Sequence, residues 1–258
     1  MHVYRQRRDE QAGQPANGKE SDESQRVEHR RIEADPAAMH RPDPIEDLDR
    51  ARDRYQKGEK REDDVGEIAL PAPARTGRIS LEEALARRRS VREFSSTPLT
   101  AQELSQLLWA AQGITHPEGL RTAPSAGALY PLELYVATAA GFYHYDPRGH
   151  RLRQHAAGDL RPALFRAALE QPPILQAPAV FLIAAVYERT AGKYGRDRAT
   201  RYVHIEAGHA AQNLLLQAVT LHLAAVPVGA FDDAQLQKAA SLPASHRPLY
   251  LIPAGHHR

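Results

Sequence analysis

The sequence predicts one α+β domain, built in two layers, over about residues 76–258. This stretch is rich in Leu, Ala and Val and is long enough to bury roughly 70% of its unfolded surface in one core. Its expected helices and strands do not alternate regularly as β-α-β units, which argues against a doubly wound parallel sheet. A near-continuous apolar run over 179–186 is typical of a central strand that is covered on both faces.

Residues 1–75 differ from the rest of the chain in composition. They hold only 8 Leu, Ile, Val or Phe residues, with 15 Lys and Arg against 18 Asp and Glu. So little apolar surface cannot offset the conformational entropy lost on folding, and we expect a mostly disordered charged arm. One amphipathic helix is expected over 45–60, and it will not fold alone.

The remaining residues carry 19 Lys and Arg against 14 Asp and Glu, a net charge of +5. This mild excess suits an anionic cofactor, whereas nucleic-acid binding usually calls for a denser basic stripe, so no nucleic-acid partner is expected. The chain has no Cys, which excludes disulfides, a thiolate nucleophile and a zinc ribbon. No apolar run has the character of a signal peptide or the length of a membrane span, so we expect a cytoplasmic protein without a membrane partner.

Two S/T-x-x-E sequences, at residues 80–83 and 100–103, predict helix N-termini with capping boxes. The first opens a short helix through Arg89. The second opens a helix with a buried stripe of Leu and Ala that ends at Gly113. A loop rich in Pro and Gly follows as far as Pro131.

Strands and helices are mixed in the rest of the domain. The turn sequence at 146–149 predicts a hairpin, and Asp159 and Asp232 are candidate helix N-caps. The many Ala residues of the longest helix predict close packing. The expected elements are, in order, strands 132–138, 142–146 and 150–154, a helix 159–169, a strand 179–186, a helix 199–223, a strand 224–228, a helix from 232 and a strand 249–252.

Three guanidiniums and a hydroxyl fall within five residues at the end of the first helix, in Arg88, Arg89, Ser90 and Arg92. Hydrogen bonds to charged groups contribute about 1.5–3 kcal/mol each, so this cluster could clamp a phosphate. The alternative interpretation is a solvated basic helix end that complements the helix dipole.

Two segments of small residues and the basic end of the chain are further candidates for binding. The loop that holds Pro124, Ser125 and Gly127 has little side-chain bulk, so its backbone can approach a flat ring or a ribityl chain closely. Gly229 follows a predicted strand and exposes a backbone N–H there. Arg258 is either a ligand contact or part of a frayed terminus.

The joint order of these pieces resembles the nitroreductase-like flavoprotein family, in which an Arg-x-Ser-x-Arg/Lys motif, a Pro-Ser loop, a Pro-x-Gly segment and a basic C-terminus follow one another. The finer resemblance, over about residues 78–255, is to SagB-type dehydrogenases, the azoline-oxidising branch. His222 departs from it, because the family usually has Gly there, and relatives often continue beyond Gly255. Six runs carry the resemblance: LEEALARRRSVREF, LSQLLWAAQGIT, RTAPSAGALYPLELYV, FYHYDPRGHRL, IEAGHAAQNLLLQAV and VPVGAFDD.

The resemblance implies the nitroreductase-like fold, with a central mixed β-sheet flanked by helices, and a homodimer whose FMN pocket is built from both subunits. It implies that the first motif holds the FMN phosphate, that the isoalloxazine lies over the Pro-Ser loop, and that the Gly229 N–H lies near flavin N5. No metal site is expected. The implied cofactor-binding residues are Arg88, Arg89, Ser90, Arg92, Pro124, Ser125, Ala126, Gly127, Leu129, Pro227, Val228, Gly229 and Arg258.

The azoline-oxidising members also use an adjacent Lys and Tyr as acid and base, and Lys193 and Tyr194 match that pair. Oxidising a thiazoline or oxazoline removes a proton from one carbon and a hydride from the other, so a base beside the flavin is required. At neutral pH the pKa of that base must lie well below its ordinary value of about 10. Because Gly192 and Gly195 flank the pair, a flexible loop is the alternative interpretation.

The leading hypothesis is thus an FMN-dependent dehydrogenase that acts on a heterocycle or similar small substrate in a modified-peptide pathway. A first alternative is a reductase that uses NAD(P)H to reduce nitro, quinone or enone compounds on the same FMN. A second is a noncatalytic flavin-binding subunit of a peptide-modifying complex, in which residues 1–75 serve as a docking arm.

Overall fold

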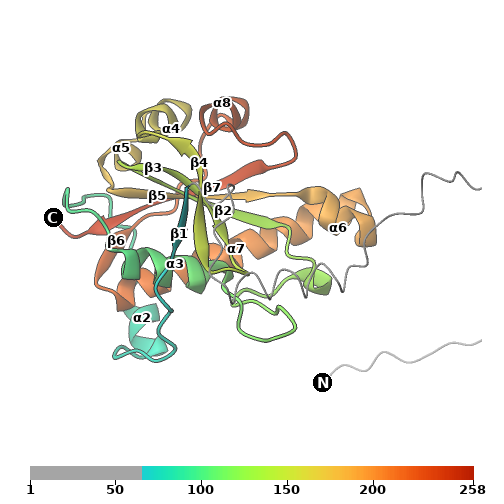
Figure 1. Cartoon of the computed structure of the whole chain (residues 1–258), viewed down its shortest axis with the longest axis horizontal. Helices are drawn as coiled ribbons and strands as arrows, with labels where there is room; N and C mark the ends of the chain where they lie inside the picture. Colours follow the sequence, from blue (N-terminus) through green and yellow to red (C-terminus); the bar gives the residue numbers. More distant parts are fainter. Residues whose placement is uncertain (1–65) are drawn as a thin grey trace, which may run out of the picture. The chain divides into compact units, whose positions relative to one another are not determined.

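The computed structural model describes residues 66–258 (Figure 1). Within these residues, seven strands form one sheet in the order β1-β4-β3-β2-β5-β7-β6, and every neighbouring pair is antiparallel. The strands are β1 (Glu67–Ala69), β2 (Leu132–Thr138), β3 (Gly141–Asp146), β4 (Arg151–Ala157), β5 (Ala179–Ala185), β6 (Leu223–Ala225) and β7 (Arg247–His256).

Three of the predicted helix starts are confirmed by contacts at the N-caps, whereas the prediction for Asp159 is wrong by one residue, because α4 has Leu160 at its N-cap, with no side-chain capping bond. Thr100 and Glu103 form a reciprocal capping box, and the Ser80 hydroxyl accepts a hydrogen bond from the Glu83 N–H. Asp232 caps its helix in the same way. The helices are α2 (Leu81–Arg87), α3 (Ala101–Gln112), the 3-10 turn η3 (Ala126–Ala128), α4 (Arg161–Ala167), α5 (Pro172–Gln176), α6 (Tyr187–Tyr194), α7 (Arg196–Thr220) and α8 (Asp233–Ala239).

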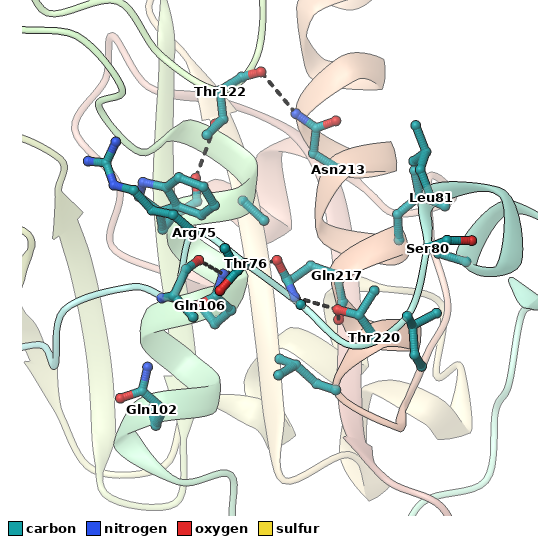
Figure 2. Close-up of a pocket in the computed structure, with 18 residues that line it drawn as sticks. Arg75, Thr76, Ser80, Leu81, Gln102, Gln106, Thr122, Asn213, Gln217 and Thr220 are labelled. Carbon is teal, nitrogen blue, oxygen red and sulfur yellow. Dashed lines mark hydrogen bonds between the residues drawn. The ribbon is translucent and has the colours of Figure 1, made fainter.

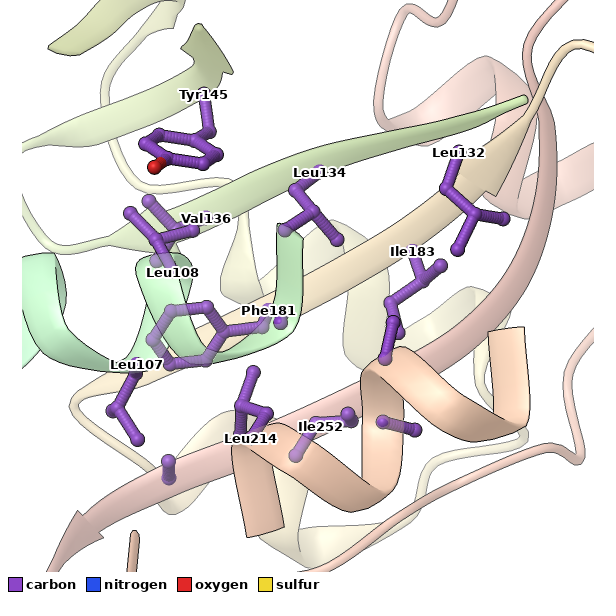
Figure 3. Packing of buried hydrophobic residues seen from close by; sticks show 14 of the residues in the cluster. Leu107, Leu108, Leu132, Leu134, Val136, Tyr145, Phe181, Ile183, Leu214 and Ile252 are labelled. Atoms are coloured by element: carbon purple, nitrogen blue, oxygen red, sulfur yellow. The ribbon is translucent and has the colours of Figure 1, made fainter. Parts of the chain in front are cut away.

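The α+β class is confirmed, but the prediction of two layers is wrong, because helices cover both faces of the sheet. Helices α3 and α7 pack on one face, where Leu107, Leu108 and Leu214 meet Phe181 of β5 (Figure 3). Helices α4, α5 and α8 pack on the other face, where Leu182 belongs to a second cluster. The domain therefore has three layers with β5 at the centre, and every residue of β5 is buried.

The implied mixed sheet is also wrong, since all pairs of described strands are antiparallel. Helix α7 carries the chain from the end of β5 to the start of β6, so β6 runs in the same direction as β5. Strand β7 then enters between them and pairs antiparallel with both. The apolar run of β5 reflects its cover on two faces, which antiparallel neighbours allow as well.

The domain begins earlier than residue 76. Strand β1 pairs with β4 through Ile68 and Leu152, and Leu70 is part of the buried core. Glu67 also forms ion pairs with Arg151 and Arg153 across this edge. The last ten residues of the predicted arm therefore belong to the fold, whereas the helix expected over 45–60 lies outside the described residues.

Helix α7 ends at a residue in an unfavourable backbone conformation. His222 has φ +56°, in the left-handed region that favours Gly, and its N–H donates to the Val219 carbonyl. This is the position at which the resembling family usually has Gly. An L side chain in this conformation costs about 1–2 kcal/mol relative to Gly.

We predict that His222→Gly raises the free energy of unfolding by about 1 kcal/mol, because Gly adopts φ +56° without a steric penalty. The matched control is His209→Gly, the same substitution at an exposed position inside α7, which should lower stability by about 0.3–0.5 kcal/mol. Urea unfolding of both variants measures the two effects. A loss of stability in His222→Gly would contradict this account of the helix end.

None of the described helices has both the length and the apolar character needed to cross a bilayer.

Candidate functional site

The predicted phosphate motif lies along one edge of the sheet. The N–H of Val91 donates to the Ala225 carbonyl of β6 at 3.0 Å, and the N–H of Ser95 donates to the His256 carbonyl at 2.9 Å. Phe94 and His257 form an isolated antiparallel bridge beside these bonds. The backbone of the motif is thereby fixed against the C-terminal end of β7, and Arg258 is the next residue of that strand's extension.

The side chains of this motif differ in what they contact. Ser90 and Arg92 are exposed, and Arg88 is half-buried. Arg89 instead turns back on α2, where its Nη1 donates to the carbonyls of Ala86 and Arg88 at 2.9 and 2.8 Å. The Arg89 guanidinium therefore caps the C-terminus of α2, as the helix-end interpretation expects. The phosphate-binding interpretation stays a prediction for Arg88, Ser90 and Arg92. We call Arg88, Ser90, Arg92 and Arg258 the basic edge.

The Pro-x-Gly segment lies on the same edge, further along β7. Val228 pairs with Leu251 through two backbone hydrogen bonds of 2.8 and 3.0 Å, and Gly229 beyond it is exposed. The side-chain amide of Gln171 donates to the Ala230 carbonyl at 2.7 Å and so fixes the segment from the α5 side. Gln171 was not predicted as a site residue, because nothing in the sequence around it points to a contact with Ala230, almost 60 residues away.

The Pro-Ser loop lies elsewhere, at the start of β2. The Ser125 hydroxyl accepts a hydrogen bond from the Tyr130 N–H at 2.9 Å, and this bond closes the loop around η3. Gly127 has φ +64°, a conformation that glycine adopts readily. Pro124 and Gly127 are exposed, so the loop presents backbone to solvent, as the sequence predicted.

Lys193 and Tyr194 pack against this loop. A Cβ added at Gly127 would lie 2.8 Å from the Tyr194 hydroxyl oxygen and 3.0 Å from Lys193 Nζ. The two residues form the last turn of α6, so the flexible-loop interpretation is wrong. Tyr194 also stacks edge-on against Tyr202 of α7, with ring centroids 5.0 Å apart. The fold thus brings together two segments that the sequence singled out separately.

Most of the predicted residues therefore fall into two groups at opposite ends of the sheet, and the Pro-x-Gly segment lies between them, beside Tyr250 and Leu251. The basic edge lies near Ala179 and Ala254, which pair at the first residue of β5. The Pro-Ser loop and the Lys-Tyr pair lie near Ala185, at the last residue of β5, where the Val186 N–H donates to the Pro131 carbonyl. Six residue steps of β5 separate these two positions, about 20 Å at 3.3 Å per step. Figure 1 shows the C-terminus and α6 at the two ends.

Comparison with known proteins identifies the family. The sequence profile of the nitroreductase family matches residues 85–256. A protein of Methanocaldococcus jannaschii that is named as a nitroreductase is 46% identical over 198 residues, which cover 74% of this chain and 97% of that one. The chain belongs to the nitroreductase family.

Two further comparisons extend this result. A protein of Ralstonia eutropha with the name of a nitroreductase has a crystal structure that matches with a TM-score of 0.68 and 32% identity, over 74% of this chain and 90% of that chain. The trifolitoxin-processing protein TfxB of Rhizobium leguminosarum is 34% identical over 117 residues, 41% of this chain and 31% of that protein. Membership of the nitroreductase family makes this chain a flavin oxidoreductase by family, and the nitroreductase-like fold is confirmed.

In this nitroreductase-family domain, a half-buried carboxylate, Glu133, joins α6 to the sheet through an ion pair. Arg189, one turn before Lys193, forms an ion pair with Glu133 of β2 and donates to the Tyr130 carbonyl at 3.0 Å. His144 Nε2 lies 2.6 Å from the other Glu133 oxygen. Burial alone would raise the pKa of Glu133, but the His144 hydrogen bond and the Arg189 charge lower it to about 2. Glu133 thereby fixes the helix that carries the Lys-Tyr pair.

A cavity of about 490 Å³ lies between α2, α3 and α7 (Figure 2). Amide side chains of Gln106, Asn213 and Gln217 line it, and Asn213 donates to the Thr122 carbonyl at 3.3 Å, just before the Pro-Ser loop. The indole N–H of Trp109, also in the lining, is buried without a hydrogen-bond partner among the described residues. None of the residues predicted for the site lines this cavity.

We predict that Glu133→Gln lowers the free energy of unfolding at pH 7 by about 2 kcal/mol, since it removes a carboxylate that the partly exposed Arg189 guanidinium and the His144 hydrogen bond hold. The folded pKa of about 2 lies below the unfolded value near 4.5, so this stabilisation is complete above about pH 4.5 and is lost as the pH falls toward 2. Urea unfolding at pH 7 and at about pH 3.5 measures the difference. Glu188→Gln, an exposed position on α6, is the control and should change little at either pH.

Proposed function

We propose that this chain binds FMN and uses it to oxidise a small heterocyclic substrate, as a dehydrogenase of the SagB type. The observation that carries the proposal is the contact of Lys193 and Tyr194 with Gly127 of the Pro-Ser loop. A potential acid and base thus lie beside a backbone surface that can receive a flat ring.

The basic edge suits the phosphate of FMN. Among the described residues, no carboxylate forms an ion pair with Arg88, Arg92 or Arg258, so these guanidiniums are available to an anion. The Ser90 hydroxyl adds a donor, and the exposed backbone of Gly229 lies on the same edge. Arg89 is left out of the proposed set because it caps α2.

The proposed active site is shared between two copies of the chain. One copy supplies the basic edge, and the other supplies the Pro-Ser loop with Lys193 and Tyr194. The separation of about 20 Å along β5 supports this division. Lys193 is exposed in a single chain, so the desolvation that a lysine base requires would come from the second copy and the substrate.

In the proposed reaction the bound flavin supplies the hydride acceptor. Lys193 or Tyr194 removes the proton from one carbon of a thiazoline or oxazoline ring, and the C–H bond at the neighbouring carbon is oxidised to give the aromatic azole. Gly127 leaves room for both side chains at the loop, because any larger residue would meet their terminal atoms. The trifolitoxin-processing relative supports a modified peptide as the substrate.

A second candidate function is the reduction of nitro, quinone or enone compounds with NAD(P)H on the same FMN. The relative from Methanocaldococcus jannaschii, with its name of a nitroreductase, favours it. Turnover of NADPH with a nitroaromatic acceptor that survives Lys193→Ala would support this reductase function over the dehydrogenase. Loss of complex formation on deletion of residues 1–75, with FMN still bound, would support the noncatalytic docking function.

We predict that the purified protein is yellow and releases FMN on denaturation, and that Arg92→Ala weakens FMN binding about 10-fold to 100-fold through the loss of a charge-assisted phosphate contact. Arg89→Ala is the matched control: its guanidinium bonds only to helix carbonyls, so FMN affinity should stay within about threefold. Titration of the apoprotein followed by flavin fluorescence measures both. A folded protein that does not bind added FMN would contradict the proposal.

We predict that two inactive variants, Arg92→Ala and Lys193→Ala, complement each other in mixed dimers. In a mixed dimer one site carries both substitutions and the other carries none, so the isolated mixed dimer should have about one half of wild-type turnover. Coexpression with two different affinity tags isolates the mixed dimer for the assay. An isolated mixed dimer without turnover would show that each site is built within one chain.

A further inference from the structure

Glu206 is a buried carboxyl beneath the Pro-Ser loop. It lies in the middle of α7 and is only 2% exposed. Gln112 Nε2, at the end of α3, lies 3.5 Å from its Oε1, and the Ser125 hydroxyl lies near enough to the carboxyl group to lower its pKa. Three segments far apart in sequence therefore meet at one carboxyl group.

The neighbours of Glu206 have fixed orientations. Gln112 Oε1 accepts a hydrogen bond from Arg121 Nη1 at 2.8 Å, so the amide nitrogen of Gln112 must face Glu206. Ser125 Oγ already accepts the Tyr130 N–H, which leaves its proton free for the carboxylate. The network thus holds both ends of the loop, at Arg121 and Tyr130, as well as its centre.

The charges that face Glu206 are few. Burial raises the pKa of Glu206 to about 7, although the hydrogen bonds of Ser125 and Gln112 and the positive charge of Arg121 act in the opposite direction. From α3 the facing group is the neutral Gln112, and from the loop the groups are Ser125 and Arg121. The carboxylate accepts from Ser125, whereas the neutral acid has a proton to donate, with Ser125 Oγ as its nearby acceptor.

We propose that Glu206 is a positioning residue of the active site, which acts through Ser125 on the Pro-Ser loop and so sets where Gly127 meets Lys193 and Tyr194. The proposal deepens the function proposed above, because it names the group that controls the position of the acid and base. Glu206 itself does not touch the substrate. The alternative is that Glu206 only fills space between α3 and α7.

The test is chosen so that it needs neither flavin nor turnover. Lys193 and Lys238 are the two lysines of the described domain, and the rate at which an amine-reactive reagent labels each can be read by mass spectrometry. In Glu206→Gln the labelling rate of Lys193 should change by about threefold or more at pH 8, the size of typical coupling effects, while Lys238 stays unchanged. The change in the labelling rate of Lys193 between pH 6 and pH 8 should also differ between Glu206→Gln and the wild type.

A second readout reports the titration itself. Because the folded pKa of about 7 lies above the unfolded value near 4.5, wild-type stability should fall as the pH rises from 4.5 to 7 and then level off. In Glu206→Gln this decline should be absent from the pH profile of the melting temperature. If Glu206→Gln does not fold, Ser125→Ala removes the link to the loop and should give the same change at Lys193.

Labelling of Lys193 that equals the wild type in both variants would overturn the positioning role, whatever the flavin result. Conversely, a changed Lys193 rate in a protein that never binds FMN would support the positioning role and overturn the proposed function alone. In the active enzyme, Glu206→Gln should remove an inflection near pH 7 from the profile of kcat/KM.

Discussion

The complete burial of β5 is the constraint on which the rest of the structure depends. Its side chains alternate between the two cores, with Phe181 and Ile183 toward α3 and α7 and Val180 and Leu182 toward the opposite helices. A strand with no exposed face needs helices on both sides and a paired strand on each edge. The order of the sheet follows, since β2 and β7 occupy the two edges of β5 and the remaining strands extend outward from them.

That central strand also separates the parts of the candidate site. The segment before β2 and the helix after β5 meet at one end of the strand, and the ends of β6 and β7 meet at the other. Side chains at both ends are tied to backbone that the sheet holds, as in the bond from Val186 to Pro131. Because every residue of β5 is buried, the strand holds the basic edge and the Pro-Ser loop at its two opposite ends within one chain.

Local signals in the sequence were enough to predict the individual parts, but not their grouping. The caps at Ser80, Thr100 and Asp232 and the strand 179–185 were predictable because neighbouring residues determine them. Helix α6 was missed because Gly192 within it and Gly195 just after it suggest a loop, and because the helix is held by long-range contacts of Arg189. Glu206 was not among the predicted site residues, since its burial arises from α3 and the Pro-Ser loop, and neither is visible in the local pattern.

The Pro-Ser loop lies between two carboxyl groups in opposite electrostatic environments. Glu133 acts on it through Arg189 and the Tyr130 carbonyl, and two cationic or hydrogen-bonding partners lower its pKa to about 2. Glu206 acts on it through Ser125, and burial with only Arg121 as a facing charge raises its pKa to about 7. Near neutral pH the first carboxyl is therefore always ionised and serves as a fixed anchor, whereas the second exists in both forms. A loop anchored at one side by a permanent charge can respond to a proton at the other side without losing its place on the sheet, because its end at Tyr130 stays bound to Arg189.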